Sequence, residues 1–383
     1  MEKLRTLRKF HCALRGTQGK RSIKNVDEKI FAASLNTLSA FGPRYLKRLK
    51  ERFGSFQQAW KASMSEYRAI KDFTPEEAAA LQKEKEETHP EKVWRELEEN
   101  RISLLLKNEL PEGILETPVP PEVLYAKGSL PDDHSHSLGV VGTRRLSGYG
   151  REAVQTIVSG LAGSGLIIVS GLARGIDAAA HETALGAKLK TVAVLGSGMA
   201  PAVLFPKENR LLADRIVEAG GAVISEYPFS ALPLPWQFPE RNRIIAGLSR
   251  AVLVVEAREK SGALITANFA LEYNRDVLAI PGSIFSENSK GPNALLRAGA
   301  ASVFSSLDIL GAFGIEYENF AENAYQEVSP IEKKILDSLS SPLSRDELIR
   351  QSGLRVQDAS SALTLLEMRG IVREAGGAIM KVK

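Results

Sequence analysis

The segment Leu166–Asp177, with the sequence LIIVSGLARGID, sets the architecture predicted for this chain. It begins with four aliphatic residues and reaches Ser170, after which Gly171 predicts a turn. The residues that follow, Arg174–Gly186, have the spacing of a helix. A short buried strand that passes through a glycine turn into a helix is the first half of a βαβ unit, whose two strands run parallel.

The same alternation repeats through the middle of the chain. Strands are predicted at six short, continuously apolar runs: Leu138–Gly142, Leu166–Ser170, Thr191–Gly196, Ala222–Glu226, Ala251–Glu256 and Val277–Pro281. Helical stretches lie between them: Gly150–Ala162, Arg174–Gly186, Glu208–Ala219, Pro239–Leu248 and Gly262–Asn274. Strict alternation at these lengths implies right-handed crossovers and a parallel sheet covered on both faces. We therefore predict an α/β fold with a Rossmann-like core at residues 132–315.

The residues before this core predict a helical unit. From residue 27 to residue 110, apolar residues recur at intervals near three and four. The segment Leu38–Leu46, LSAFGPRYL, is typical of two helices joined by a glycine turn. Ile70–Ala78 matches the same pattern less well. We predict a helix-hairpin-helix or SAM-like domain, for which a nucleic-acid-binding role and a purely packing role both stay open. Residues 111–131 carry five prolines and predict a linker or an edge segment.

The residues after the core predict a winged helix. Beyond a linker at 316–328, residues 329–383 have the pattern of three helices and two strands around Gly376 and Gly377. The third helix, Val356–Arg369, would be the recognition helix, yet Val356–Met368 contains no Lys or Arg. Because a helix that reads the major groove is expected to carry such side chains, we favour a protein-contact or accessory role over duplex reading.

Composition narrows the class of protein. The 383 residues are 44% hydrophobic and 25% charged, which is typical of a globular chain, and no apolar run is long enough to span a membrane. Cys12 is the only cysteine, so no intrachain disulfide can form and we expect a cytoplasmic location. The net charge of +4 excludes a histone-like polycation but allows a local basic groove. Residues 1–26 predict a flexible basic arm, with a frayed terminus of no function as the alternative.

Phosphate is the ligand that the carboxyl ends of the predicted strands favour. In an open α/β sheet, ligands bind outside these ends. Here the ends lead into glycines and small hydroxyl residues at helix starts, as at Ser170 and Gly171, where backbone N–H groups can bind an anion. Basic residues stand in the same turns: Arg144, Arg145, Arg174 and Lys260.

Two enzyme classes that use this fold fit the sequence poorly. A dinucleotide site would need G-x-G-x-x-G after the first strand, but Arg144 stands two residues after Gly142. The phosphoribohydrolases that resemble lysine decarboxylases carry P-G-G-x-G-T-x-x-E, and Pro281–Glu287 keeps only its first two residues. A nucleotide-binding or nucleotide-hydrolysing enzyme of that kind stays as the alternative function. We find no catalytic constellation, Walker loop or metal-ligand spacing, and predict no catalytic residue, no metal and no cofactor.

The acidic residues nearest the sheet edge are predicted to be structural. Asp177 and Glu256 have arginines within a few residues, and Glu226 could meet one across the edge of the sheet. Ion pairing is therefore favoured over a role as general base. His181 stands one helical turn after Asp177, where we expect it to make an orienting hydrogen bond.

A series of motifs resembles one known family. In order along the chain they are Gly142-Thr143-Arg144, Ser170–Asp177, Phe205–Asn209, Phe238–Ser249, Ser261–Ala267 and Gly291-Pro292-Asn293. This order resembles the DprA/Smf family of DNA-processing proteins of natural transformation, and the string FPERNRIIAGLS is its most specific part. The match is dense over residues 120–310. One departure is Gly198-Met199-Ala200-Pro201, where relatives usually have Gly-x-Asp, which puts any role of that acid in doubt.

The resemblance implies a non-catalytic protein that binds incoming single-stranded DNA, forms a homodimer and loads a RecA-type recombinase onto the strand. Further competence or single-strand-binding proteins are additional partners, and no membrane is involved. Such a protein needs a positive track for the DNA backbone and aromatic faces for the bases. We expect Phe238 to stack a base and Asn242 to bond a base edge or a phosphate. The predicted DNA-binding residues are Arg144, Arg145, Ser170, Gly171, Arg174, Lys207, Phe238, Arg241, Asn242, Arg243 and Lys260.

Two expectations attach to this assignment. For Arg243, an ion pair with Glu226 or Glu256, which would make it structural, is expected as much as a contact with DNA. For Arg241, the DNA contact is favoured. At the end of the core, a last strand is predicted at Ala301–Phe304, followed by a short helix. Its residues Leu307 and Leu310 are expected at a two-fold dimer interface, with packing against the sheet as the alternative.

Overall fold

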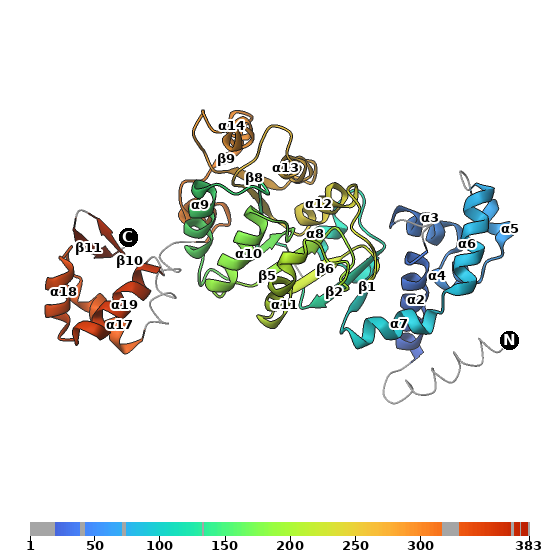
Figure 1. The fold of residues 1–383 in the computed structure, drawn as a ribbon, viewed down its shortest axis with the longest axis horizontal. Coiled ribbons are helices and arrows are strands. Elements are labelled where there is room, and N and C mark those ends of the chain that lie inside the picture. The colour runs from blue at the N-terminus through green and yellow to red at the C-terminus, as the bar shows by residue number, and fades with distance from the viewer. Residues whose placement is uncertain are drawn as a thin grey trace.

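The computed structural model describes residues 20–38, 43–70, 74–131, 134–315, 329–368, 371–375 and 377–381 (Figure 1). Among these residues a nine-stranded sheet forms the centre, in the order β1-β2-β6-β5-β4-β3-β7-β8-β9. Its parallel strands are β3 (Ser137–Val141), β4 (Ile167–Ser170), β5 (Thr191–Leu195), β6 (Ala222–Ser225), β7 (Ala251–Val254), β8 (Asp276–Ala279) and β9 (Ala301–Ser302). The predicted Rossmann-like core is confirmed.

Helices cover both faces of this sheet. One face packs against α9 (Gly148–Ser159), α10 (Ile176–Gly186), α11 (Arg210–Glu218) and α15 (Ser306–Ala312). The other packs against α8 (Glu112–Leu115), α12 (Gln237–Gly247) and α13 (Gly262–Glu272), while α14 (Lys290–Arg297) lies against β8. Every residue of β3, β5, β6 and β7 is buried. Burial on both faces explains why these strands are continuously apolar rather than alternating.

Two antiparallel strands extend the sheet beyond the predicted core. β1 (Ser103–Leu106) pairs with β2 (Val123–Gly128), which in turn pairs antiparallel with β6. The prediction that residues 27–110 are helical throughout is therefore wrong at its C-terminal end. Of the two readings of 111–131, the edge segment is the correct one, because β2 and α8 fall within it. Strands of four to six residues at a sheet edge carry too short a pattern to separate from a helix end.

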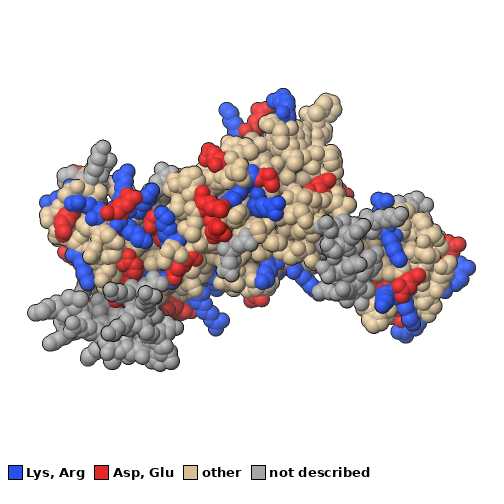
Figure 2. Space-filling model, turned by 180° about the vertical axis from the view of Figure 1, so that it is seen from behind, with Lys and Arg blue, Asp and Glu red and all other residues tan. Residues whose placement is uncertain are grey.

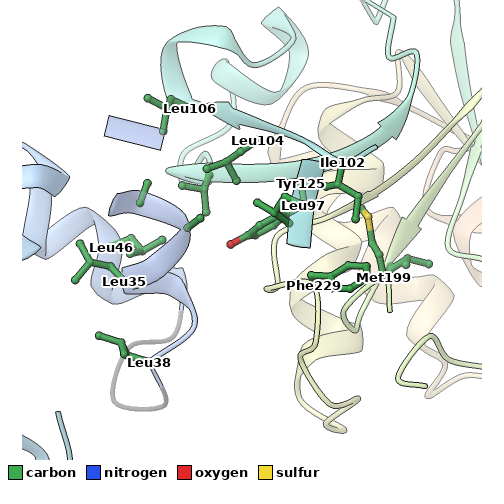
Figure 3. Close-up of a cluster of buried hydrophobic side chains, with 14 of the residues drawn as sticks. Leu35, Leu38, Leu46, Leu97, Ile102, Leu104, Leu106, Tyr125, Met199 and Phe229 are labelled. Atoms are coloured by element: carbon green, nitrogen blue, oxygen red, sulfur yellow. The ribbon is translucent and has the colours of Figure 1, made fainter. Parts of the chain in front are cut away.

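The N-terminal helices pack directly on this edge. They are α2 (Lys20–Asn36), α3 (Pro43–Phe53), α4 (Phe56–Lys61), α5 (Met64–Arg68), α6 (Pro75–Glu87) and α7 (Pro90–Glu99). Figure 3 shows Leu35 and Leu46 of these helices in the same buried cluster as Leu104 and Tyr125 of the two edge strands. Asn36 also donates a hydrogen bond from Nδ2 to the backbone oxygen of Glu226 over 3.1 Å. The helical unit and the sheet thus share one continuous core.

The prediction of a flexible arm over residues 1–26 is wrong at its C-terminal end. Helix α2 begins at Lys20, so residues 20–26 are helical despite Ser22 in their middle. Residues 1–19 lie outside the described residues, as do Ser39–Gly42 in the predicted glycine turn. Within the described part of the chain, no helix is both long and apolar enough to cross a membrane.

The C-terminal unit is the predicted winged helix. It comprises α17 (Pro330–Ser338), α18 (Arg345–Ser352), α19 (Val356–Met368), β10 (Val372–Ala375) and β11 (Ala378–Lys381). Capping boxes open two of the helices, Ser329 with Glu332 and Ser344 with Glu347. Leu348, Leu363 and other apolar residues form a separate hydrophobic core within this unit.

One predicted interface residue belongs to the core instead. Leu310 of α15 is 1% exposed and packs with Ile309 in the cluster between the sheet and α9. Leu307 is 42% exposed and Phe304, which precedes the helix, is 75% exposed. The expectation for Leu310 is therefore wrong. The short helix presents one apolar face inward, and only Leu307 of the two predicted residues stays at the surface.

Candidate nucleic-acid interface

Two adjoining hollows open at the carboxyl ends of β3, β4 and β7, where the sequence predicts a ligand site. Arg144 and Phe238 belong to the walls of both hollows. We call the first the aromatic hollow; it is lined by Arg144, Gly171, Ala173, Arg174, Phe205, Pro206 and Phe238. We call the second the basic hollow; its lining includes Thr143, Arg144, Asp177, Arg241, Asn242, Arg258 and Lys260. Both aromatic rings of the site line the first hollow, and Arg258 and Lys260 line only the second.

Phe238 is half-buried near the start of α12. A side chain at Gly196, after β5, would bring its Cβ within 2.8 Å of the Phe238 ring, so glycine is required for this approach. The ring of Phe205 meets Phe238 edge-on, with centroids 5.6 Å apart. Phe205 is 39% exposed, and sequence analysis did not select it as a site residue. Two aromatic rings therefore form one wall of the aromatic hollow.

Arg144 covers the remaining face of Phe238. Its Cζ atom lies 5.5 Å from the ring centroid, and no described carboxylate forms an ion pair with it. An exposed cation–π contact contributes only about 0.5–1 kcal/mol. A flat ligand group can therefore displace the Arg144 guanidinium from the ring at small cost.

Gly175 fixes the loop that carries Arg144. Its φ is +82°, and a Cβ at this position would lie 2.2 Å from the backbone oxygen of Thr143. The next residue, Ile176, donates its backbone N–H to that same oxygen over 3.1 Å. The N-terminus of α10 thus packs directly against the turn after β3.

Arg241 does not belong to an exposed track, contrary to the sequence prediction. Its side chain is 3% exposed and donates from Nη1 to the backbone oxygens of Gly171, over 2.7 Å, and Val194. Burial lowers the pKa of Arg241 to about 10, while Asp177 opposes that shift. The guanidinium is therefore still charged at neutral pH, and it ties two strand ends together beneath the hollows.

Asp177 lies beside this buried cation. Its Oδ2 accepts hydrogen bonds from the backbone N–H groups of Gly171, over 3.1 Å, and Ala173. Burial raises the pKa of Asp177, and Arg241 and these N–H groups act in the opposite direction. The structural role predicted for this acid agrees with these contacts, although they come mainly from backbone amides.

His181 does not bond to Asp177 as expected. Its Nδ1 lies 2.7 Å from the Thr191 hydroxyl, and the ring is completely buried. Burial, and to a smaller extent the charge of Arg241, lowers the pKa of His181 to about 3. The imidazole is therefore neutral and belongs to the core.

Two more residues of the FPERNRIIAGLS string have structural partners, and one of them, Asn242, also lines the basic hollow. Arg243 binds both carboxylate oxygens of Glu226 over 2.6 Å, which is the structural alternative left open by the sequence. Asn242 donates from Nδ2 to the backbone oxygen of Gly262 over 3.1 Å and accepts from Arg241. Glu256 accepts hydrogen bonds from Ser147 at the start of α9, so its partner is a serine and not an arginine.

The remaining predicted residues divide between framework and surface. Ser170 is fully buried and donates its hydroxyl to the backbone oxygen of Val140. Gly171 lines the aromatic hollow, where a Cβ would lie 2.5 Å from the Arg241 guanidinium. Arg174 forms an ion pair with Glu208. Lys207 is exposed near the aromatic hollow, two residues after Phe205.

Exposed cations without a described carboxylate partner gather around the basic hollow. Arg145, Arg258 and Lys260 are exposed, and no described carboxylate forms an ion pair with any of them. Arg258 is not among the residues predicted from the sequence, although it stands in the same turn as Lys260. Elsewhere the surface is mixed: Figure 2 shows basic and acidic side chains interspersed over the face opposite to that of Figure 1. Among the described His, Cys, Asp and Glu side chains, no group of three could hold a metal ion.

Comparison with known proteins gives consistent matches. The family described as DNA recombination-mediator protein A matches residues 101–314, and the DprA winged helix domain matches residues 321–378. Protein Smf of Synechocystis is 33% identical over 91% of this chain and 98% of its own length. The crystal structure of DNA processing protein A from Streptococcus pneumoniae is 34% identical, with a TM-score of 0.61 over 74% of this chain and 97% of that one. A structure of the Helicobacter pylori DNA processing protein A, whose title concerns its single-stranded DNA binding mode, is 29% identical with a TM-score of 0.49.

Proposed function

The chain belongs to the DNA recombination-mediator protein A family, and from this premise we propose that it binds single-stranded DNA at the paired hollows. The observation that carries this proposal is the cation–π contact at Phe238, where the Arg144 guanidinium that lies over the ring has no described carboxylate partner. Arg258 and Lys260 extend the positive charge next to it. An aromatic face beside unpaired cations is what a single strand requires, because bases stack on the ring and phosphates bind the cations.

Arg144 and Phe238 would act in sequence as the strand enters. The Arg144 guanidinium occupies the ring face now, so a base that stacks on Phe238 must displace it. The displaced side chain remains next to the same base and can bind its phosphate, since Arg forms bidentate contacts with phosphate oxygens.

We further propose that the protein acts as a mediator without chemistry of its own and presents the strand to a RecA-type recombinase. Asp177, which lines the basic hollow, and Glu226 and Glu256, which follow β6 and β7, are all engaged in hydrogen bonds or an ion pair. In the loop that the phosphoribohydrolase comparison used, Glu287 forms an ion pair with Lys290 over 2.7 Å. These four acids therefore have structural partners, which disfavours the nucleotide-hydrolase alternative.

A homodimer is part of the proposal. Phe304 and Leu307 leave an exposed apolar surface at the start of α15, and such surfaces commonly mark interfaces. Two hollows on one dimer would raise the effective concentration of the second site for a long strand. Light scattering of Leu307→Arg tests this. A monomer that binds short oligonucleotides normally supports the interface, and a dimer places it elsewhere.

Equilibrium binding of labelled oligothymidylate over a range of salt concentrations tests the DNA site. Phe238→Ala should lower the affinity by about 1–3 kcal/mol, because one stacked base is lost. The salt slope of this variant should not change, since stacking releases no counterions. Arg144→Ala should instead reduce that slope by about 0.7, the value for one phosphate contact on a single strand. Wild-type affinity and slope in both variants would refute the site.

A further inference from the structure

The loop between β8 and α14 displays two large apolar side chains in solvent. Phe285 is 91% exposed and Ile284 is 78% exposed, and Phe285 is the most exposed of the large apolar residues that the structure describes. Single exposed apolar residues are ordinary on protein surfaces. Two adjacent apolar side chains at the tip of a loop form a contiguous exposed patch, and such patches commonly mark binding sites.

Hydrogen bonds hold this loop in a defined shape. The backbone N–H of Gly282 donates to Asn293 Oδ1 over 3.2 Å, and Asn293 Nδ2 donates back to the Gly282 oxygen over 3.0 Å. A turn closes the tip, where Ser286 donates its N–H to the Ser283 oxygen over 3.0 Å. Phe285 is therefore presented by an ordered turn, so little ordering cost remains to be met on binding.

The same loop is fastened to the rim of the basic hollow. Asn288 donates from Nδ2 to the backbone oxygen of Arg145 over 3.4 Å, and its own backbone oxygen accepts from Ala257 over 2.7 Å. Tyr149, 48% exposed at the start of α9, donates its hydroxyl to the Pro281 oxygen over 2.6 Å. The turns that carry Arg145 and Arg258 thus lie directly beside the loop that carries Phe285.

We propose that Phe285, with Ile284 beside it, is a second stacking platform for bases of the strand whose first base occupies the Phe238 site. This inference rests on the proposed function. Phe238 packs on Gly196 after β5, and β8 lies four positions from β5 in the sheet, which corresponds to about 19 Å at the usual strand spacing. A strand must be longer than about 3 nucleotides to cover that distance. The phosphates between the two rings would meet Arg145, Arg258 and Lys260.

The surroundings of the patch favour a nucleic acid over a protein partner. Protein interfaces are depleted in Lys and, at their fully buried centre, in charged residues generally, although Arg is enriched in them. Here the loop adjoins turns with Arg145, Arg258 and Lys260, none of which pairs with a described carboxylate. An apolar ring next to unpaired cations matches a base with its phosphates.

Oligothymidylates of two lengths test the inference on the full chain. Phe285→Ala should bind an oligomer of about 12 nucleotides at least about five-fold more weakly than the wild type, with an unchanged salt slope. It should bind an oligomer of about 3 nucleotides as the wild type does, because that length does not reach the second ring. Phe285→Trp should keep the affinity for the longer oligomer, since indole also stacks. Leu271→Ala removes an exposed apolar residue from the far end of α13 and should change neither affinity.

The outcomes separate this inference from the proposed function. Phe238→Ala should weaken binding of both lengths. If it does so while Phe285→Ala binds the longer oligomer normally, the second platform is wrong and the first site stands. If Phe238→Ala leaves both lengths unaffected, the proposed site itself fails. A change of oligomeric state in Phe285→Ala, measured by light scattering, would assign the patch to contact between copies of this chain and overturn the inference.

Discussion

Two surface arginines of the winged helix differ in their pairing from three cations at the rim of the sheet. In the winged helix, Arg345 bridges Glu367 over 2.8 Å and Glu374 over 3.1 Å, and Arg355 binds Asp358 over 2.8 Å. At the rim, Arg145, Arg258 and Lys260 have no described carboxylate partner. A paired cation must give up its carboxylate before it can bind phosphate. The count of basic residues therefore says less about DNA binding than their pairing does.

A third arginine environment lies beneath the rim. Arg241 is buried against Asp177 and backbone oxygens, so its charge stabilises the strand ends that form the hollows. The three environments make different predictions for the same substitution: loss of stability for a buried arginine, loss of DNA affinity for an unpaired one, and little of either for a paired surface one.

Arg241→Ala should lower the free energy of unfolding by about 3–5 kcal/mol, because it leaves the buried Asp177 carboxylate without its cation. Arg345→Ala removes surface ion pairs and should cost about 1 kcal/mol or less. Urea unfolding of both variants measures the difference. Equal, small losses would mean that Arg241 is not the buried link described here.

Acid should weaken the sheet domain before the winged helix. Burial lowers the pKa of His181 to about 3, so between its ordinary value of 6.5 and that value the unfolded chain binds a proton that the folded chain excludes. Stability is then fully present above pH 6.5 and falls with decreasing pH, by about 2 kcal/mol at pH 5. Residues 329–383 contain no histidine.

Unfolding curves at pH 7.5 and pH 5 check this prediction, with His181→Gln as the matched variant. Loss of the pH dependence in that variant is expected. The same loss of stability in His181→Gln as in the wild type would show that another group titrates.

Removal of the winged helix should have a small effect on single-stranded DNA binding. A chain that ends near Asn323 should keep its oligothymidylate affinity within about three-fold, or ~0.6 kcal/mol. The reason is that α19 carries no cation and Arg345 and Arg355 are paired. Fluorescence anisotropy measures the affinity, and a tenfold loss would contradict the assignment of binding to the rim.

The sequence predicts the architecture well because the patterns there are local. Continuous apolar runs, glycine turns and capping residues such as Ser344 mark elements that form from neighbouring residues. The edge strands β1 and β2 are not predicted, because they are short and because the sheet edge depends on pairing of β2 with β6, which lies far along the chain.

The candidate site is predicted in outline but not in the role of each residue. The family resemblance selects turns that line the two hollows, and Phe238 and Arg144 belong to the walls of both. Arg241 is expected more firmly at the DNA than Arg243, yet Arg241 is buried, and Arg243 pairs with Glu226 as the structural alternative allowed. Burial and pairing across the sheet depend on residues tens of positions away, and Leu310 is misjudged for the same reason.

The salt dependence of oligothymidylate affinity compares the unpaired and paired cations directly. Arg258→Ala combined with Lys260→Ala should reduce the slope of log affinity against log salt by about 1.4, at about 0.7 for each lost phosphate contact. Arg345→Ala, from the paired surface of the winged helix, should leave the wild-type slope. A double variant with the wild-type slope, or an Arg345→Ala slope that falls instead, would show that the strand does not follow the rim of the sheet.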